Sequence, residues 1–498
     1  MLSIKRNSKQ MNRIYINRRI AVIFLFLTGL IVGAKLLPQN WEIAYCGVSL
    51  VAIIWITFNG MCKNDKQAAA FLLALPILFS AFQNIYLGWA ANELTSTELQ
   101  ILLSYNILIV IFGVCMSCMK FRCRGSYIPY ILILFILLFD SAILYYLYPS
   151  DIVAFVSSLR NIISCICIYI LAICVGEKTD IKTVFKVLNI ICAIVILTGF
   201  MELWVGNSLW KSLNIDILWP LKGIKVNGNT GVPNNWYSSE KINGVPIRRM
   251  VSTFADPVNL GSYLFAMYMT AWYQNKKWFS VLIICACALT VSKGALLGFL
   301  FFIVIYAFFK DKTRIFSAIV FGTVLLTGIG FIQMTQRYSS GSTMFHIRQF
   351  FSSFQILKSN LFGMGVGNAG VLAGLVYGLE NISIGETGIG VIIAQLGIIG
   401  LGAYIIFIFL LARVPFKYCY TGDFREKVFY CTLLFSFVAN AMFNEVALSI
   451  NSCAVYFLML GKLTLVMREK YSNDIRQKDM LQGGKPDDHI YTYSTSCT

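Results

Sequence analysis

The chain has 498 residues, of which 58% are hydrophobic and 13% are charged, and its formal net charge is +18 at pH 7. About half of the residues of a soluble domain are apolar, so this composition excludes a soluble globular protein. Apolar runs of about 18–22 residues recur from end to end, and each can cross about 30 Å of hydrocarbon. Alternating ten-residue segments, which are typical of a β-barrel, do not occur. The sequence therefore predicts an all-α polytopic membrane protein.

A basic segment, residues 1–19, precedes the first predicted span. Seven spans are predicted within residues 20–205, four within 257–333 and three within 387–467, about 12–14 in all because the pair around Lys293 is difficult to separate. The predicted spans are 20–37, 44–62, 69–89, 100–119, 127–148, 151–175, 183–205, 257–275, 278–292, 294–309, 314–333, 387–411, 427–446 and 451–467. Two long loops, 206–256 and 334–386, lie between these groups. A polar tail, 468–498, has a composition typical of disorder.

The distribution of Lys and Arg predicts the orientation of the chain. The short loops "PQNWEI", "WAANELTSTE" and "YPSD" hold neither residue, whereas the alternate connections are basic. This asymmetry follows the positive-inside rule, which places both termini in the cytoplasm and both long loops outside. The net charge therefore reflects topology, and no nucleic-acid partner is expected.

The fifteen cysteines do not indicate disulfides or a metal site. Neither long loop contains a cysteine, so no disulfide framework is expected on the oxidising side. The spacing of "CMSC" at Cys115–Cys118 suits zinc, but no second pair or histidine completes it. We expect no metal and no cofactor.

The first long loop ends in "RRMVSTFADPVNLGSYL", which places charged and turn-forming residues where a span begins. Asp256 is a plausible N-cap for a helix that starts at Pro257. The positive end of that helix dipole would lie close to Arg248 and Arg249, and together they suit a lipid phosphate or diphosphate. The alternative is that both arginines contact lipid headgroups. Asn259 belongs to the same predicted binding surface.

The second long loop contains Arg337 and Arg348, followed by a run whose apolar positions fit an amphipathic helix in the membrane interface. We expect Arg348 at the start of this helix and Lys358 at its end. The Gly-x-Gly-x-Gly stretch that includes Gly363 and Gly365 predicts a tight backbone turn and not a nucleotide-binding loop.

Two charged residues are expected inside the membrane. Asp140 and Arg160 lie ten residues on either side of Ser150, at a short outside turn, which places both about 12–15 Å below the outer surface. Such charges usually pair or line a polar cavity. They predict either a structural ion pair or a site where Arg160 faces the substrate.

Several of these motifs resemble the O-antigen polymerase and ligase family. The resemblance covers about residues 245–412 and consists of an arginine-led Thr-Phe-x-Asp-Pro-x-x-Leu-Gly entry to a span, then "TVSKGALLGF", "NLFGMGVGN" and "GETGIGVIIAQLGIIGLGAYIIFIFLL". The matching positions are Arg249, Asp256, Pro257, Gly261, Ser292, Arg348, Gly363, Gly365, Gly397 and Gly400. Lys293 stands where the family often has arginine, and the histidine expected in the ligase branch is absent.

The resemblance implies a glycosyltransferase-C-like fold with two long external loops. It also implies a polymerase that joins undecaprenyl-diphosphate-linked repeat units into O-antigen or capsule at the outer face of the bacterial cytoplasmic membrane. Its partners would be the lipid-linked oligosaccharide, membrane lipids and a regulator of chain length. A ligase that transfers finished chains, or a flippase or transporter of lipid-linked sugars, is the alternative.

The reaction needs cations for the departing diphosphate, positioning, and a base. Arg249, Arg348 and Arg337 are the predicted diphosphate clamp, and Arg248, Arg160 and Lys293 are further binding residues. Glu386 is the first candidate base and Asp256 the second. The alternative for each is that the carboxylate serves solely as a helix cap.

Overall fold

The computed structural model describes residues 66–481, with scattered gaps within 93–126 and 311–341 and continuous gaps at 243–244, 378–386 and 419–423. The predicted spans 20–37 and 44–62, residues 1–19 and residues 482–498 of the tail therefore lie outside the described residues. The prediction of a disordered tail is wrong for residues 468–481, which continue the helix α18 (Ile450–Leu481). The spans 100–119 and 314–333 lie only partly inside them.

Seven helices of the described part are long and apolar enough to cross a membrane. They are α3 (Lys66–Ala90), α5 (Ile128–Leu147), α6 (Ile152–Gly176), α7 (Ile181–Val205), α12 (Lys293–Lys310), α16 (Gly388–Tyr418) and α18 (Ile450–Leu481). Each overlaps a predicted span. The chain is a mainly helical, multi-pass membrane protein, as its composition predicts.

Three other predicted spans are helical but shorter or more polar. They are α10 (Pro257–Tyr273), α11 (Lys277–Leu289) and α17 (Phe424–Phe443). With 13 residues, α11 is about 20 Å long and falls short of the hydrocarbon thickness. The first turn of α17 contains charged residues, which lower its hydropathy.

Aspartate N-caps fix where three of the helices begin. The carboxylate of Asp151 accepts from the backbone N–H groups of Val153 and Ala154 at the start of α6. Asp180 and Asp256 do the same at the start of α7 and α10. Each cap satisfies donors that the first turn would otherwise leave unpaired.

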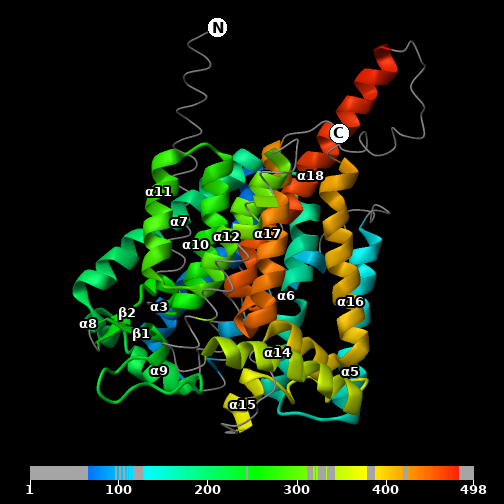
Figure 1. Ribbon diagram of the computed structural model, residues 1–498. Helices are drawn as coiled ribbons and strands as arrows, with labels where there is room; N and C mark the ends of the chain where they lie inside the picture. The colour runs from blue at the N-terminus through cyan, green and yellow to red at the C-terminus, as the bar shows by residue number, and fades with distance from the viewer. Residues whose placement is uncertain are drawn as a thin grey trace.

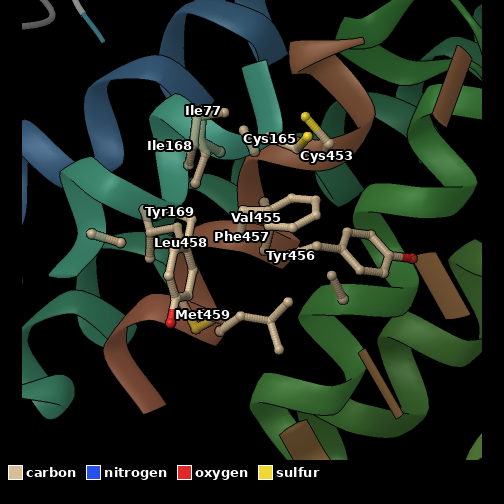
Figure 2. Packing of buried hydrophobic residues seen from close by; sticks show 14 of the residues in the cluster. Ile77, Cys165, Ile168, Tyr169, Cys453, Val455, Tyr456, Phe457, Leu458 and Met459 are labelled. Carbon is tan, nitrogen blue, oxygen red and sulfur yellow. The ribbon is translucent and has the colours of Figure 1, made fainter. Parts of the chain in front are cut away.

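The centre of the bundle is formed by α6 and α18, which pack along each other. Figure 2 shows this contact, where Tyr169 of α6 lies against Leu458 and Met459 of α18. By contrast, α5 and α12 lie at the edge, and Phe135 of α5 is 63% exposed. An apolar side chain that is exposed on a spanning helix suits contact with lipid tails.

The long connections gather at one end of the bundle, which we call the loop end (Figure 1). The first long loop forms α8 (Asn207–Ser212), α9 (Ile215–Leu221), the 3₁₀ turn η2 (Asn234–Trp236), the antiparallel hairpin β1 (Tyr237–Ile242) and β2 (Val245–Arg248), and the 3₁₀ turn η3 (Ser252–Phe254). Its short elements agree with the turn-rich composition. A small core that includes Trp210, Leu218 and Trp236 holds these elements together.

The second long loop contains α14 (Ser342–Ser359) and α15 (Val371–Tyr377). The predicted amphipathic helix is confirmed, and α14 runs across the loop end in Figure 1. The expected position of Arg348 is wrong, because α14 begins six residues earlier and places it in the second turn. Gln349 and Ser353 are buried, whereas Phe351 is 64% exposed. The phenylalanine side therefore suits the membrane interface.

The predicted span 387–411 is interrupted inside α16. Gly397 has φ +59°, so two helical segments meet there at a kink. The glycine turn of the second loop lies in this break: Met364 and Gly365 donate backbone N–H groups to the carbonyls of Ala394 and Gln395, and Ile398 N donates to Leu361 O at 2.9 Å. Backbone groups released by the break are thus satisfied by the loop, as a buried site requires.

Candidate functional site

The start of α10 forms a compact hydrogen-bonded unit at the loop end. Asp256 accepts from the backbone N–H of Asn259 at 3.0 Å, from the Asn259 side-chain amide and from Asn235 Nδ2 at 3.1 Å. Asn259 Oδ1 in turn accepts from Ser449 Oγ at 3.2 Å, just before α18. The predicted N-cap is confirmed, and three accepted bonds occupy most of the capacity of its two oxygens.

Opposing influences act on the Asp256 carboxyl. Burial raises its pKa above the ordinary value, whereas the hydrogen bonds from Asn259 and the positive charge of Arg249 oppose the rise. The position of Asp256 as an N-cap gives it a structural role whether or not it also accepts a proton.

Arg249 joins the first long loop to the turn between α11 and α12. Its Nε donates to Thr290 O at 2.8 Å, Nη1 to Asn235 O at 3.0 Å and Nη2 to Val291 O at 3.2 Å. Val291 has φ +47°, a strained conformation for a β-branched residue. Strain of this kind persists where surrounding contacts fix the backbone, and it concentrates at functional sites.

Arg248, the last residue of β2, forms an ion pair with the buried carboxylate of Glu202 in α7. Arg248 Nη2 lies 3.2 Å from Glu202 Oε2, and its guanidinium lies 4.8 Å from the centre of the Trp236 ring. Glu202 also accepts from Trp210 Nε1 and from the backbone of Val251. Glu202 is missing from the predicted site, although it is the one acidic residue in the span 183–205 and could have been singled out on that ground.

The predicted ion pair between Asp140 and Arg160 is wrong. Both residues are described, and no ion pair joins them. One carboxylate oxygen of Asp140 has no hydrogen-bond partner among the described residues, and Arg160 Nη1 instead donates to Leu103 O at 3.1 Å.

Arg160 lies close to a lysine that the sequence did not indicate. Lys222, directly after α9, donates from Nζ to Asn84 Oδ1 of α3 at 2.5 Å. Burial and then the charge of Arg160 lower the pKa of Lys222 to about 7. Within the described part of the chain, no carboxylate forms an ion pair with either cation. Leu103, whose carbonyl accepts from Arg160, packs against the core that contains Trp219, so the two cations lie on neighbouring segments at the loop end.

The glycine turn is confirmed and packs against the break in α16. Gly363 and Gly365 have φ +88° and +93°. A Cβ on Gly363 would lie 2.5 Å from the Gln395 carbonyl, so only glycine fits against the break in α16. After the turn, Val371 N donates to the buried carboxylate of Glu445 at 2.8 Å, at the start of η4 (Glu445–Leu448).

The remaining predicted residues are not gathered at one point. Arg348 is exposed on α14, and Lys293 is exposed at the first residue of α12. Arg337 and Glu386 lie outside the described residues, so the predicted three-arginine clamp and the first candidate base are not described as a unit.

A groove of about 390 Å³ runs between α16 and α17. Its lining includes Ile392, Tyr404, Ile408, Phe437, Val438 and Leu448. None of the described residues that line the groove is charged, so it suits an apolar chain.

No group of three or more His, Cys, Asp or Glu side chains that could hold a metal ion occurs in the part of the chain that the structure describes. Comparison with protein-family models and with curated proteins finds no match to this chain.

Proposed function

We propose that this protein is a polymerase that joins oligosaccharide repeat units carried on undecaprenyl diphosphate, at the outer face of the bacterial cytoplasmic membrane. Both termini are then cytoplasmic, and the loop end faces outward. The fold in this proposal is glycosyltransferase-C-like.

The observation that supports the proposal most is the clustering of the residues that carry the resemblance. Arg249 bonds the two residues before Ser292, and a Cβ on Gly261 would overlap the Ser292 side chain. A Cβ on Gly363 would lie 2.7 Å from Gly397 N. Segments far apart in sequence thus meet in two separate tight contacts, and each contact joins residues of different motifs, as expected if the motifs act together.

The reaction follows from the donor. A sugar hydroxyl of one lipid-linked unit attacks the anomeric carbon of the growing chain, a new C–O bond forms, and the bond from that carbon to the diphosphate oxygen breaks. The hydroxyl proton passes to a base, for which Glu386 and Asp256 remain the candidates. Undecaprenyl diphosphate leaves with the bonding electrons, and nearby cations stabilise its charge.

The break in α16 bears on the alternative of a transporter, because transporters place substrates at discontinuous helices. Here the freed backbone groups near Gly397 bond the glycine turn of the same chain and are therefore occupied. This favours a structural role for the break over a substrate site.

The glycan profile of a deletion strain, compared with strains that express wild-type protein or Arg249→Ala, tests the proposal. Lys182→Ala is the matched control, because it removes an exposed cation at the end of α7 that lies away from the loop end. Protein level in the membrane is measured in each strain.

A polymerase predicts that single lipid-linked repeats accumulate on the outer side of the deletion strain and that long chains disappear. Long chains that remain on the lipid carrier would establish a ligase instead. Repeats retained on the cytoplasmic side would establish a flippase, and either result would overturn the proposal.

A further inference from the structure

The strongest feature that the family motifs do not account for is the pair of cations formed by Arg160 and Lys222. Arg160 lies on α6, eight residues from its start, and Lys222 lies at the end of the short helix α9. They come from segments about 60 positions apart. Arg160 donates to the carbonyl of Leu103, and Leu103 packs against the small core that contains Trp219, three residues before Lys222. The fold therefore brings the two segments together, and no local motif encodes this.

Both side chains are partly buried and keep unused donors. Arg160 Nη1 donates to Leu103 O, whereas its buried Nε has no partner among the described residues. Lys222 has three N–H donors, of which one meets Asn84 Oδ1. The Nζ atom lies 5.0 Å from the centre of the Trp219 ring, and the indole N–H of Trp219 is also buried without a partner.

Two like charges in a partly buried site repel each other, and neither has a counter-charge among the described residues. A purely structural pair would be expected to include a carboxylate, as the pair of Arg248 and Glu202 does. The arrangement instead suits an anion with several acceptor oxygens, because unpaired donors and positive charge then find partners together.

The depth of the site below the loop end favours an anion that is attached to a membrane lipid. Eight residues of α-helix span about 12 Å, so Arg160 lies that far from the loop-end start of α6. Asn84 lies six residues from the end of α3, at a similar level. A phosphate carried on a membrane lipid can reach this level while its apolar chain stays in the bilayer.

We propose that Arg160, Lys222 and Asn84 form the site that binds the diphosphate of the lipid-linked substrate. Arg160 and Lys222 supply the charge. Asn84 positions Lys222 by accepting one of its N–H groups, and its own amide is held by the Phe254 carbonyl. This assignment rests on the proposed function for the identity of the lipid. It assigns the diphosphate to residues other than Arg249, whose guanidinium nitrogens bond backbone carbonyls.

The test is direct binding by the purified full chain in phosphatidylcholine nanodiscs. The probe is N-acetylglucosamine linked to farnesyl diphosphate, and farnesyl N-acetylglucosaminide, which lacks the diphosphate, is the control ligand. The variants are Arg160→Gln and Lys222→Gln. Lys211→Gln is the matched control, because Lys211 is an exposed lysine of the same loop.

Each site variant should weaken binding of the diphosphate probe by at least about tenfold, since a hydrogen bond to a charged group is lost. Binding of the control ligand should not change, and Lys211→Gln should bind both as the wild type does. Lys222→Arg should retain binding, which guards against a Gln variant that fails to fold.

Equal affinity of wild type, Arg160→Gln and Lys222→Gln for the probe would overturn the assignment. Full displacement of the probe by phosphatidylglycerol in the nanodisc would also overturn it, because the site would then accept any phospholipid headgroup. Two results together separate this assignment from the proposed function. If binding depends on Arg160 and Lys222 but deletion of the gene leaves long glycan chains intact, the diphosphate site stands and the polymerase is rejected. If deletion abolishes long chains but binding does not depend on these residues, the polymerase stands and the diphosphate site is rejected.

Discussion

Replacing Glu202 by alanine should detach the first long loop from the end of α7. The Glu202 carboxylate is fully buried and accepts four hydrogen bonds: from Trp210 Nε1 at 2.7 Å, Arg248 Nη2 at 3.2 Å, Val251 N at 2.7 Å and Ser252 N at 3.3 Å. Alanine leaves all four donors without their acceptor.

The cost can be estimated from the charges and donors left behind. Breaking a buried ion pair by removing one partner costs about 3–5 kcal/mol, and a buried donor left unpaired costs about 1–3 kcal/mol. Arg248 can turn toward water, so the three other donors, at about 1–3 kcal/mol each, set the loss, and we expect about 3–5 kcal/mol in total. Glu202→Gln should lose roughly half of this, because one amide oxygen can serve only one of the two pairs of donors.

Thermal unfolding of the purified protein in detergent, together with limited proteolysis, measures the effect. The expected order of stability is wild type, then Glu202→Gln, then Glu202→Ala, with new cleavage within residues 206–256 in the alanine variant. Asp216→Asn is the control, because Asp216 is an exposed acidic residue in α9 of the same loop. Unchanged unfolding temperature and cleavage for Glu202→Ala would refute the role assigned to this carboxylate.

Three further changes test separate parts of the structure. Gly397→Ala should destabilise the protein by about 2–4 kcal/mol, because φ is +59° and the added methyl would overlap a loop carbonyl, whereas Gly402→Ala has open space and should be neutral; thermal unfolding separates them. Binding of the fully ionised diphosphate probe should weaken as pH rises through about 7, because Lys222 then loses its proton and only Arg160 remains charged. In Lys222→Arg, binding measured by titration between pH 6 and 8.5 should depend less on pH. With its folded pKa lowered from 10.5, Lys222 should also make the ligand-free protein more stable as pH rises from about 7 to 10.5, since the unfolded chain binds more protons in that window. Lys462→Met should cost about 2–4 kcal/mol in the same unfolding assay, because two carbonyls at the end of α6 lose a donor at 2.6 Å.

At the loop end, the sequence predicts the glycine turn but not its position against the break in α16. Closely spaced glycines predict a tight turn, and positive φ at Gly363 and Gly365 confirms it. Nothing in "NLFGMGVGN" indicates that the turn fills a break in a helix some thirty residues later. The continuous apolar run 387–411 predicted a single helix, because hydropathy reports burial in lipid and not backbone continuity.

For charged residues too, local contacts could be predicted from the sequence, whereas contacts between distant segments could not. Their sequence position correctly placed Asp256 as an N-cap, since capping depends on residues within one turn. The pairing of Asp140 with Arg160 was wrong, because equal depth on neighbouring helices does not fix which faces meet. Arg248 pairs with Glu202, and the charge of Arg160 acts on Lys222, although these residues are far apart in the chain.

The sequence by itself determined that this protein is helical and crosses a membrane several times, because apolar length and helix capping are properties of contiguous residues. The tertiary structure decided which cations have partners and which do not. Ion pairing depends on distances between side chains on different helices and loops, and short-range patterns carry no information about those distances. For that reason the pair of Arg160 and Lys222, with which no carboxylate of the described residues forms an ion pair, depends on how α6 and α9 each pack against α3.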